Sequence, residues 1–340
     1  MKERKYGNLQ VSEIGLGCMG FSHGYGHIPD EQYSIEAIQA AFSEGCHFFD
    51  TAEAYGPNLL PENKGHNEKI LGKALQGLKG VSRSDYQIAT KLHLPTQEAR
   101  EKGVYPAIKE HLMASLERLQ TDYADLYYLH RINHDIPVEE VAEAMKKLYE
   151  EGLIRGWGLS QVDVDIIERA QKIFPLSAVQ NIYSMVERGV EKEVIPYCLA
   201  NNILLVAFSP TSSGLLSGKV HTNTEFEKVD DVRNFVPQLK KENLEKNQPI
   251  VDLLNKYAAL KNATPVQISL AWMLHKYPNV VPIPGSKNKV RISENLHSAD
   301  IVFTREEFEN LDHELNAIEV YGYRGFSEHQ GSTIADWGKR

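Results

Sequence analysis

The sequence predicts an α/β fold, a closed (β/α)8 barrel with an N-terminal hairpin or extension and extra C-terminal helices. Short apolar runs rich in β-branched and aromatic residues alternate along the chain with longer amphipathic stretches. The apolar runs are continuous, which is typical of parallel strands covered by helices. Eight such units follow one another, and eight is the number that closes a barrel of this kind.

The eight strands are expected at residues 13–17, 46–50, 86–92, 124–130, 154–160, 177–183, 203–209 and 279–285. Between them, apolar residues recur at intervals of three and four, which predicts one buried face of a helix. These helices are expected at residues 33–45, 67–78, 106–120, 138–152, 163–173 and 191–202. Several of the stretches end in Gly or Asn, as helix C-caps do.

Four later segments depart from this repeat. Residues 210–248 form a long polar connection, and connections of this length are usually functional or mobile. Residues 249–278 are expected to form two helices that are split near Asn262, and residues 304–318 one more helix. Residues 320–340 are expected to form a loose tail. No linker interrupts the chain, so a single domain is expected over residues 1–340.

Composition restricts the function. The chain has 340 residues, 42% of them hydrophobic, which is enough to bury a large core. Its net charge is −9, so a basic face that binds nucleic acid is not expected. No window of eighteen apolar residues predicts a membrane span, and the N-terminus has no apolar signal region. The three cysteines are far apart, which favours a reducing, cytoplasmic location. The oligomeric state stays open.

Four ionisable residues fall at the carboxyl ends of successive predicted strands, where barrels of this kind place their chemistry. Asp50 ends the second strand and Tyr55 lies in the loop behind it, in DTAEAYG. Lys91 lies at the end of the third strand and His130 ends the fourth. Neighbouring parallel strands lie about 4.8 Å apart, so we expect these side chains to converge.

Each residue type has a chemical reason to be there. A tyrosine is a poor acid at neutral pH, and a nearby ammonium lowers its pKa by stabilising the phenolate. Lys91 can supply that charge, and Asp50 can compensate the buried lysine. A neutral His130 can position a carbonyl oxygen, so Tyr55 can protonate that oxygen as its carbon is attacked. Taken singly, each residue is better explained as a cap, a packed ring, a solvated charge or a core histidine; the joint arrangement favours a site.

At these residues the chain resembles the aldo-keto reductase family, above all its longer bacterial members and the potassium-channel β-subunits. DTAEAYG, the lysine of ATKL and the histidine of YLHR match its motifs, and the resemblance covers nearly the whole chain in order. It implies a (β/α)8 barrel, an extended nicotinamide cofactor and carbonyl reduction. It also implies that Tyr55 is the general acid, that His130 binds the substrate oxygen, and that Lys91 and Asp50 tune the tyrosine.

The resemblance further implies a set of cofactor contacts. WGLS and VQNIYS match segments that bind the carboxamide, AFSP one whose aromatic residue lies against the nicotinamide ring, and SGLLSGK a loop around the pyrophosphate. PIPGSKNKVRISENL resembles the strand and helix that bind adenosine. The residues concerned are Met19, Asp50, Ser160, Gln161, Gln180, Phe208, Ser209, Pro210, Gly214, Leu215, Lys219, Arg233, Gly285, Ser286, Lys287, Arg291, Glu294 and Asn295. Lys287 and Arg291 favour NADP(H) over NAD(H), because the 2′-phosphate supplies the discriminating charge, whereas Lys289 is expected to be solvated.

Two other patterns were weighed. GLGCMG fits the G-x-G-x-x-G pattern of a dinucleotide fold, but a loop follows it instead of a helix, so a Rossmann dehydrogenase is not favoured. We expect this segment to end the first strand, with Met19 and Phe21 lining the substrate pocket beside Tyr55 and His130. His130 and His134 have metal-like spacing but no third ligand, so no metal is expected.

Two functions remain open. The first is an NADPH-dependent reductase of a small aldehyde or ketone. The second is an NADP(H)-sensing regulatory subunit of another protein, as the channel β-subunits suggest. The complete set of Asp50, Tyr55, Lys91 and His130 favours the enzyme, because a sensor has little use for a tuned acid.

Overall fold

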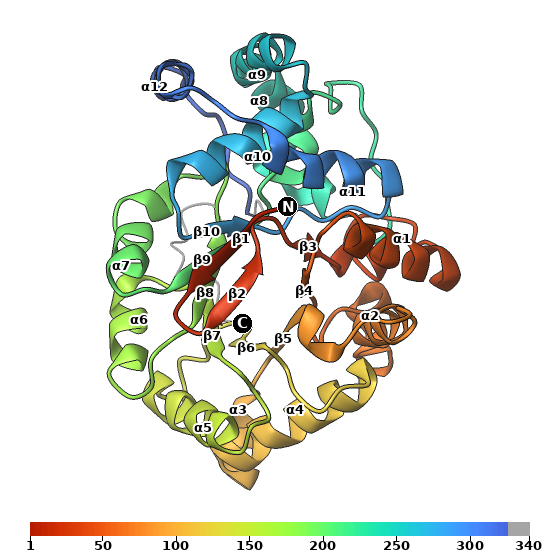
Figure 1. Cartoon of the computed structure of the whole chain (residues 1–340), viewed down its shortest axis with the longest axis vertical. Coiled ribbons are helices and arrows are strands. Elements are labelled where there is room, and N and C mark those ends of the chain that lie inside the picture. Colours follow the sequence, from red (N-terminus) through yellow and green to blue (C-terminus); the bar gives the residue numbers. More distant parts are fainter. Residues whose placement is uncertain (326–340) are drawn as a thin grey trace.

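A computed structural model of the chain describes residues 1–325 and contains a barrel of eight parallel strands (Figure 1). The strands are β3 (Leu16–Gly17), β4 (Phe48–Asp50), β5 (Gln87–Leu92), β6 (Leu126–Leu129), β7 (Trp157–Ser160), β8 (Ala178–Ile182), β9 (Leu204–Phe208) and β10 (Val280–Pro282). Each pairs in parallel with the next along the chain. All eight predicted strands are therefore confirmed.

The two ends of the sheet meet between β3 and β10. A parallel bridge joins Gly17 to Gly285, and the Gly15 amide donates to the Pro282 carbonyl at 3.0 Å. The backbones approach so closely here that a Cβ atom on Gly17 would lie 2.8 Å from the Ile283 carbonyl oxygen. The glycines of GLGCMG thus serve barrel closure, as a strand end and not as a dinucleotide fingerprint.

Helices surround the barrel (Figure 1). They are α1 (Glu31–Ser43), α2 (His66–Gln76), α3 (Thr96–Lys102), α4 (Val104–Leu119), α5 (Val138–Glu150), α6 (Val164–Gln171), α7 (Val194–Ala200), α8 (Lys241–Lys246), α9 (Gln248–Lys261), α10 (Pro265–Lys276), α11 (Lys289–Leu296) and α12 (Arg305–Asn316). The expected helices are all present, with α9 and α10 split at Asn262 as predicted. The sequence analysis did not predict α3 and α8.

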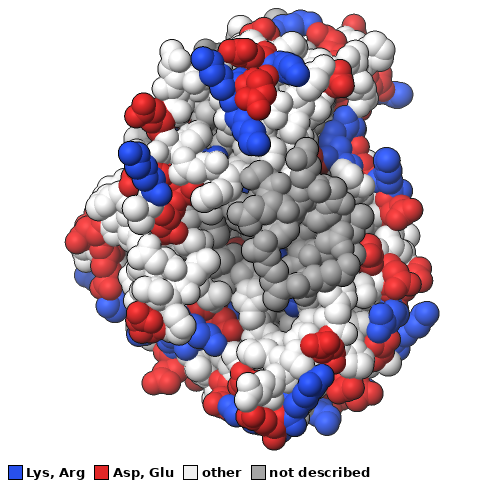
Figure 2. All heavy atoms as spheres, turned by 180° about the vertical axis from the view of Figure 1, so that it is seen from behind, with Lys and Arg blue, Asp and Glu red and all other residues white. Residues whose placement is uncertain are grey.

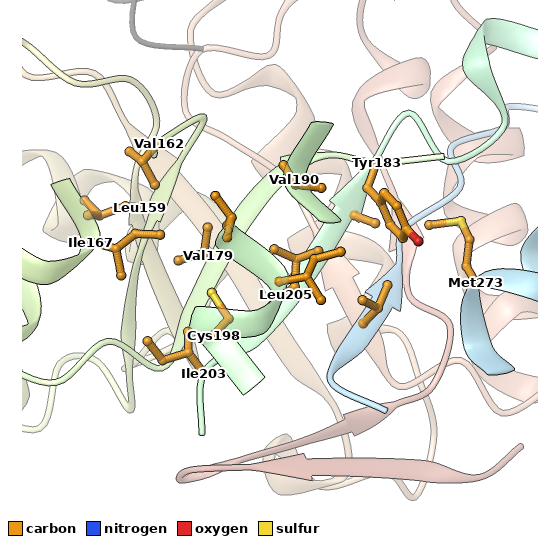
Figure 3. Packing of buried hydrophobic residues seen from close by; sticks show 14 of the residues in the cluster. Leu159, Val162, Ile167, Val179, Tyr183, Val190, Cys198, Ile203, Leu205 and Met273 are labelled. Atoms are coloured by element: carbon orange, nitrogen blue, oxygen red, sulfur yellow. The ribbon is translucent and has the colours of Figure 1, made fainter. Parts of the chain in front are cut away.

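Apolar side chains fill the barrel and the layer outside it. The inner cluster includes Phe48, Leu126, Tyr128 and Val206. The outer cluster packs the strands against the helices. Figure 3 shows part of it, with Val179 of β8, Leu205 of β9, Cys198 of α7 and Met273 of α10. Burial of this kind contributes roughly 25 cal/mol for each Å² of apolar surface removed from water.

An antiparallel hairpin closes one end of the barrel. It consists of β1 (Glu3–Tyr6) and β2 (Leu9–Ser12), and Figure 1 shows it lying across the barrel end. Leu9 and Val11 of β2 are buried in the same cluster as the barrel interior. The predicted N-terminal hairpin is confirmed, and the hairpin leaves the opposite end of the barrel uncovered.

The C-terminal segment is only partly described. Of the expected loose tail, residues 326–340 lie outside the described part of the chain. Residues 320–325 are held in place: the Tyr321 amide donates to Asn247 Oδ1 and the Asn247 amide group donates to the Tyr321 carbonyl, each at 2.9 Å. The expectation that these residues are loose is wrong, because Asn247, directly before α9, holds them through these two hydrogen bonds.

The surface carries both signs of charge. Figure 2 shows the face opposite to that of Figure 1, where Lys and Arg side chains are interspersed with Asp and Glu around the rim. Among residues 1–325, no helix is both long enough and apolar enough to cross a membrane.

Candidate active site

The four predicted ionisable residues meet at the carboxyl end of the barrel. Asp50 is the last residue of β4, Lys91 lies in β5, and His130 directly follows β6. Tyr55 comes from the loop after β4, and its backbone amide donates to the Ala52 carbonyl at 3.1 Å, which turns the loop back over the strand end. The convergence expected from strand spacing is therefore what the structure shows.

Lys91 is at the centre of this group and is fully buried. Its Nζ donates to Asp50 Oδ1 at 2.5 Å and to the Thr51 carbonyl at 2.7 Å. The other oxygen of Asp50 accepts a hydrogen bond from Gln180 Nε2 at 2.7 Å. Burial acts to lower the pKa of Lys91, but the Asp50 carboxylate and the Tyr55 hydroxyl outweigh it and raise the pKa above its ordinary value. Lys91 is thus a cation at neutral pH.

Tyr55 places its hydroxyl 3.4 Å from Lys91 Nζ, and the ammonium lies 5.0 Å from the ring centroid. Burial raises the pKa of Tyr55 above its ordinary value, although Lys91 and Arg131 act to lower it. The direction predicted for the influence of Lys91 is correct, but burial is the larger effect. Tyr55 is therefore a protonated hydroxyl at neutral pH, beside a fixed positive charge.

His130 lies edge-on to Tyr55, with ring centroids 5.7 Å apart, and its ring is 4.5 Å from that of His93. Burial, followed by the charges of Arg131, His93 and Lys91, lowers the pKa of His130 well below its ordinary value. Its buried Nδ1 has no hydrogen-bond partner within residues 1–325. A neutral imidazole with a spare nitrogen is suited to binding a polar ligand atom.

The loop that carries Tyr55 is tied to the helices behind it through Glu53, which the sequence analysis missed. Glu53 is buried and its carboxylate contacts His111 of α4 at 2.7 Å and Lys64 at 3.0 Å. His111 also contacts Glu98 of α3 at 3.0 Å. The second oxygen of Glu53 accepts from the His93 amide at 3.1 Å. This network links the catalytic loop to His93, which follows Lys91 by two residues.

A cavity of about 340 Å³ opens above these residues. Ten predicted residues line it: Met19, Asp50, Tyr55, His130, Ser160, Gln180, Phe208, Ser209, Pro210 and Gly285. The sequence analysis missed other lining residues, among them His23, His93, Arg131 and Arg324. They follow no spacing rule, and their position at the ends of strands or loops was the only signal available for them.

A second cavity of about 370 Å³ adjoins the first. The two share five lining residues, Gly20, Tyr25, Thr211, Ser213 and Gly285, so together they form one elongated groove. Nine predicted residues line the second cavity: Gly214, Lys219, Arg233, Gly285, Ser286, Lys287, Arg291, Glu294 and Asn295. An elongated groove with its chemistry at one end suits an extended ligand.

Besides the fully buried Lys91, three predicted residues do not line the groove. Phe21 is fully buried in the core beside α1, so its prediction as a pocket residue is wrong: the 3₁₀ helix Met19–Phe21 directs Met19 into the cavity and Phe21 into the core. Leu215 is also a core side chain. Gln161 is buried and its Oε1 accepts from the Ile182 amide at 2.9 Å, which fixes β8.

Two segments from distant parts of the sequence join along the groove, and we call residues 23–27 and 227–234 together the strap. Tyr25 forms an antiparallel bridge with Asp231, and His23 Nδ1 lies 2.6 Å from Asp230 Oδ1. Lys287 Nζ donates to the carbonyls of Tyr25, at 2.8 Å, and His27. The strap and the basic end of the groove are thus in direct contact.

The groove suits a ligand with phosphate groups on two observations. Lys219, Arg233, Lys287 and Arg291 line the second cavity, so cations outnumber the acids there, which suits phosphate groups. In addition, the hydroxyl of Ser213 is buried on the wall shared by both cavities and has no partner within residues 1–325. Within the same residues, no group of three or more His, Cys, Asp or Glu side chains is arranged to hold a metal ion.

Comparison with known proteins gives consistent matches. The sequence model described as the aldo/keto reductase family matches residues 13–316. A probable aldo-keto reductase from Glycine max is 34% identical over 327 residues, which cover 94% of this chain and 90% of the relative. The structure of a glycerol dehydrogenase from Gluconobacter oxydans is similar with a TM-score of 0.80 and 26% identity, covering 93% of this chain and 96% of the other. A Klebsiella pneumoniae aldo-keto reductase solved with NADPH is similar with a TM-score of 0.70 and 27% identity, covering 92% and 94%.

Proposed function

Since this chain belongs to the aldo/keto reductase family of NAD(P)-dependent oxidoreductases, we propose that it uses NADPH to reduce a small aldehyde or ketone to the alcohol. The observation that carries the proposal is the position of Lys91 Nζ, between the Asp50 carboxylate and the Tyr55 hydroxyl at the cavity wall. A buried ammonium held beside a protonated phenol makes a proton donor whose conjugate base is stabilised.

Each side chain has one task in this reaction. The bound nicotinamide supplies the hydride that the carbonyl carbon receives. Tyr55 gives its proton to the carbonyl oxygen, and Lys91 stabilises the phenolate that remains. The neutral His130 hydrogen-bonds to the same oxygen and orients it. The net change is addition of one hydride and one proton to the C=O bond, and solvent returns the proton to Tyr55.

Residues along the groove would hold the cofactor. Ser160 and Gln180 would bind the carboxamide, Phe208 would lie against the ring, and Lys219 would meet the pyrophosphate. At the far end Lys287, with Arg291, would bind the 2′-phosphate, which supports NADPH over NADH. The NADPH-bound Klebsiella pneumoniae relative supports the cofactor class. We also propose ordered binding, with NADPH first.

The sensor alternative receives less support. A regulatory subunit needs a dinucleotide groove, but it does not need a buried lysine that stabilises a phenolate. The three cysteines are free thiols, which supports the proposed cytoplasmic location.

The decisive experiment follows absorbance at 340 nm with purified protein, NADPH or NADH, and carbonyls from small dicarbonyls to aromatic aldehydes. Tyr55→Phe should lower kcat by at least about 100-fold, because general acid catalysis typically contributes 10²–10⁴-fold. NADPH binding, measured by fluorescence titration, should stay nearly the same. Tyr149→Phe is the matched control, because Tyr149 is 43% exposed on α5 and does not line the groove.

Normal turnover by Tyr55→Phe would show that Tyr55 is not the acid. Tight NADPH binding by the unchanged protein, without turnover of any carbonyl, would favour the sensor.

A further inference from the structure

The wall of the first cavity includes a buried arginine that the proposed reaction does not use. Arg324 follows α12 and is only 8% exposed. It lines the cavity, and its Nε is buried with no hydrogen-bond partner within residues 1–325. A buried guanidinium nitrogen without a hydrogen-bond partner is costly, so its place at a cavity wall points to a ligand that pairs with it.

The carboxylate of Glu187 is bonded to the backbone of Arg324 and not to its side chain. Glu187 accepts from the backbone amide of Arg324 and from Gln238 Nε2 at 3.2 Å. Within the described residues, no ion pair of 4 Å or less joins the Glu187 carboxylate to the Arg324 guanidinium. Burial raises the pKa of Glu187, although Arg324 acts to lower it. Glu187 therefore holds the backbone of this segment and leaves the guanidinium at the cavity.

A second guanidinium lies on the same wall. Arg131 Nη1 donates to Ser160 Oγ at 3.0 Å and to the His130 carbonyl at 2.5 Å. Among the described lining residues the only acid is Asp50, and both of its oxygens are already engaged by Lys91 and Gln180. Among the described residues, the wall of the first cavity therefore offers no free carboxylate to pair with Arg324.

The two arginines reach the wall from different parts of the fold. Arg131 directly follows His130 at the end of β6 and donates to its carbonyl. Arg324 follows α12 and is held at the segment after β8, where its backbone amide donates to Glu187. Arg131 therefore lies beside the place proposed for the carbonyl oxygen, and a carboxylate bound at Arg324 would be joined to the carbonyl carbon by a spacer.

Resting on the proposed reductase function, we propose that Arg324 binds a carboxylate of the substrate, so that the substrate class is aldehydes or ketones with a carboxylate remote from the carbonyl. Arginine forms two parallel hydrogen bonds to a carboxylate, which fixes the orientation of the group as well as its charge. The length of the spacer between the carboxylate and the carbonyl then determines which substrates bring their carbonyl group to Tyr55 and His130.

The test compares 4-carboxybenzaldehyde with methyl 4-formylbenzoate, two aldehydes of similar shape that differ in charge. The unchanged protein should have the higher kcat/KM for the carboxylate. In Arg324→Met the ratio of the two kcat/KM values should fall about 10- to 100-fold, mostly through KM, because a hydrogen bond to a charged group is lost. Arg324→Lys should restore part of the ratio. Equal kcat/KM for both aldehydes in the unchanged protein, or an unchanged ratio in Arg324→Met, would overturn the proposal.

Arg305→Met is the matched control, because the Arg305 side chain is 91% exposed and pairs only with Glu309 on its own helix among the described residues. It should leave the ratio as it is. Thermal unfolding adds a second readout: Arg324→Met should not lower the melting temperature, since it removes a buried guanidinium whose Nε has no partner within residues 1–325. A clear drop in melting temperature with no change in ratio would show that Arg324 is structural.

Calorimetry separates this proposal from the reductase function. 4-(Hydroxymethyl)benzoate should bind to the NADP⁺-saturated protein more tightly than its methyl ester, and Arg324→Met should remove the difference. If neither aldehyde is reduced but this binding difference is found, the carboxylate site stands and the proposed reaction fails. If both aldehydes are reduced equally and the difference is absent, the reaction stands and the carboxylate site fails.

Discussion

At the residue scale, the site depends on a buried ion pair that serves chemistry at a cost to stability. Lys91 is fully buried and Asp50 nearly so. Apolar residues at these two positions would cost less free energy to bury. The pair is kept in place by hydrogen bonds from Lys91 to Thr51 and from Gln180 to Asp50. The arrangement gives Tyr55 a permanent positive neighbour whose position does not depend on solvent.

Asp50→Asn should lower the free energy of unfolding by about 3–5 kcal/mol, because it leaves the Lys91 ammonium buried without a counter-charge. Chemical denaturation measures this change. Glu36→Gln is the control: its pair with Lys289 is solvent-exposed, with side chains 50% and 35% accessible, and its loss should hardly change the stability. Losses of similar size in the two variants would argue against a buried, charged Lys91.

The pH dependence of reduction follows from the two shifted groups. The pKa of His130 is lowered, so it becomes charged only well below pH 6.5, and the pKa of Tyr55 is raised, so it loses its proton only above pH 10. We therefore expect kcat to be nearly constant between these two pH values. Steady-state rates across that range check the expectation, and an inflection near the ordinary pKa of histidine would contradict the neutral, buried state of His130.

The four ionisable residues could be predicted because they follow a fixed order at strand ends. Arg324 could not be, because it lies in the segment that was expected to form a loose tail. That segment is held by Glu187, which accepts from the Arg324 amide, and by Asn247, which donates to the Tyr321 carbonyl, and both are remote in sequence. Arg131 and His93 were missed for a different reason. They follow the predicted residues His130 and Lys91 by one and two positions, and only the three-dimensional turn of each strand end decides which residue faces the cavity.

At the element scale, the helices that the sequence analysis missed share one property. In α3 the buried side chain is Ala99, and in α8 it is Leu244, so neither helix has an apolar stripe from which it could be predicted. By contrast, α12 was predictable from its apolar spacing, and Thr304 and Glu307 form a capping box at its start. Short helices that are mostly polar form because their neighbours hold them, and α3 is held in part by Glu98.

The link between α3, α4 and the catalytic loop should make stability depend on pH. Burial lowers the pKa of His111, and so does the charge of Lys64. Glu53 and Glu98 outweigh both effects and raise the pKa above its ordinary value. The stabilisation is therefore fully present below about pH 6.5, the unfolded value, and is lost as the pH rises through the higher folded value. His111→Gln should lose about 1–3 kcal/mol relative to the unchanged protein at pH 6 and less at pH 9.

Urea denaturation of both proteins at the two pH values measures this difference. An equal loss at pH 6 and pH 9 would show that the charge of His111 does not matter and that only its packing does.

At the scale of the whole molecule, the seam between β3 and β10 determines whether the barrel closes. Gly17→Ala should lower the free energy of unfolding by about 1–3 kcal/mol, since its Cβ would press on the Ile283 carbonyl at 2.8 Å. Gly189→Ala is the control, because no atom lies within 4 Å of the added Cβ there and its φ is not positive. Melting temperatures compare the two variants, and equal values would mean that the seam adjusts without cost.

The hairpin β1–β2 covers the barrel end opposite the groove, and this has a practical consequence for handling the molecule. Met1 is 41% exposed at that end. A reporter protein or a surface linker joined ahead of Glu3 would leave the mouth of the groove facing outward. Protein immobilised through this end should therefore exchange the proposed nucleotide and carbonyl ligands as freely as it does in solution, which suits it to a flow reactor or an electrode coating.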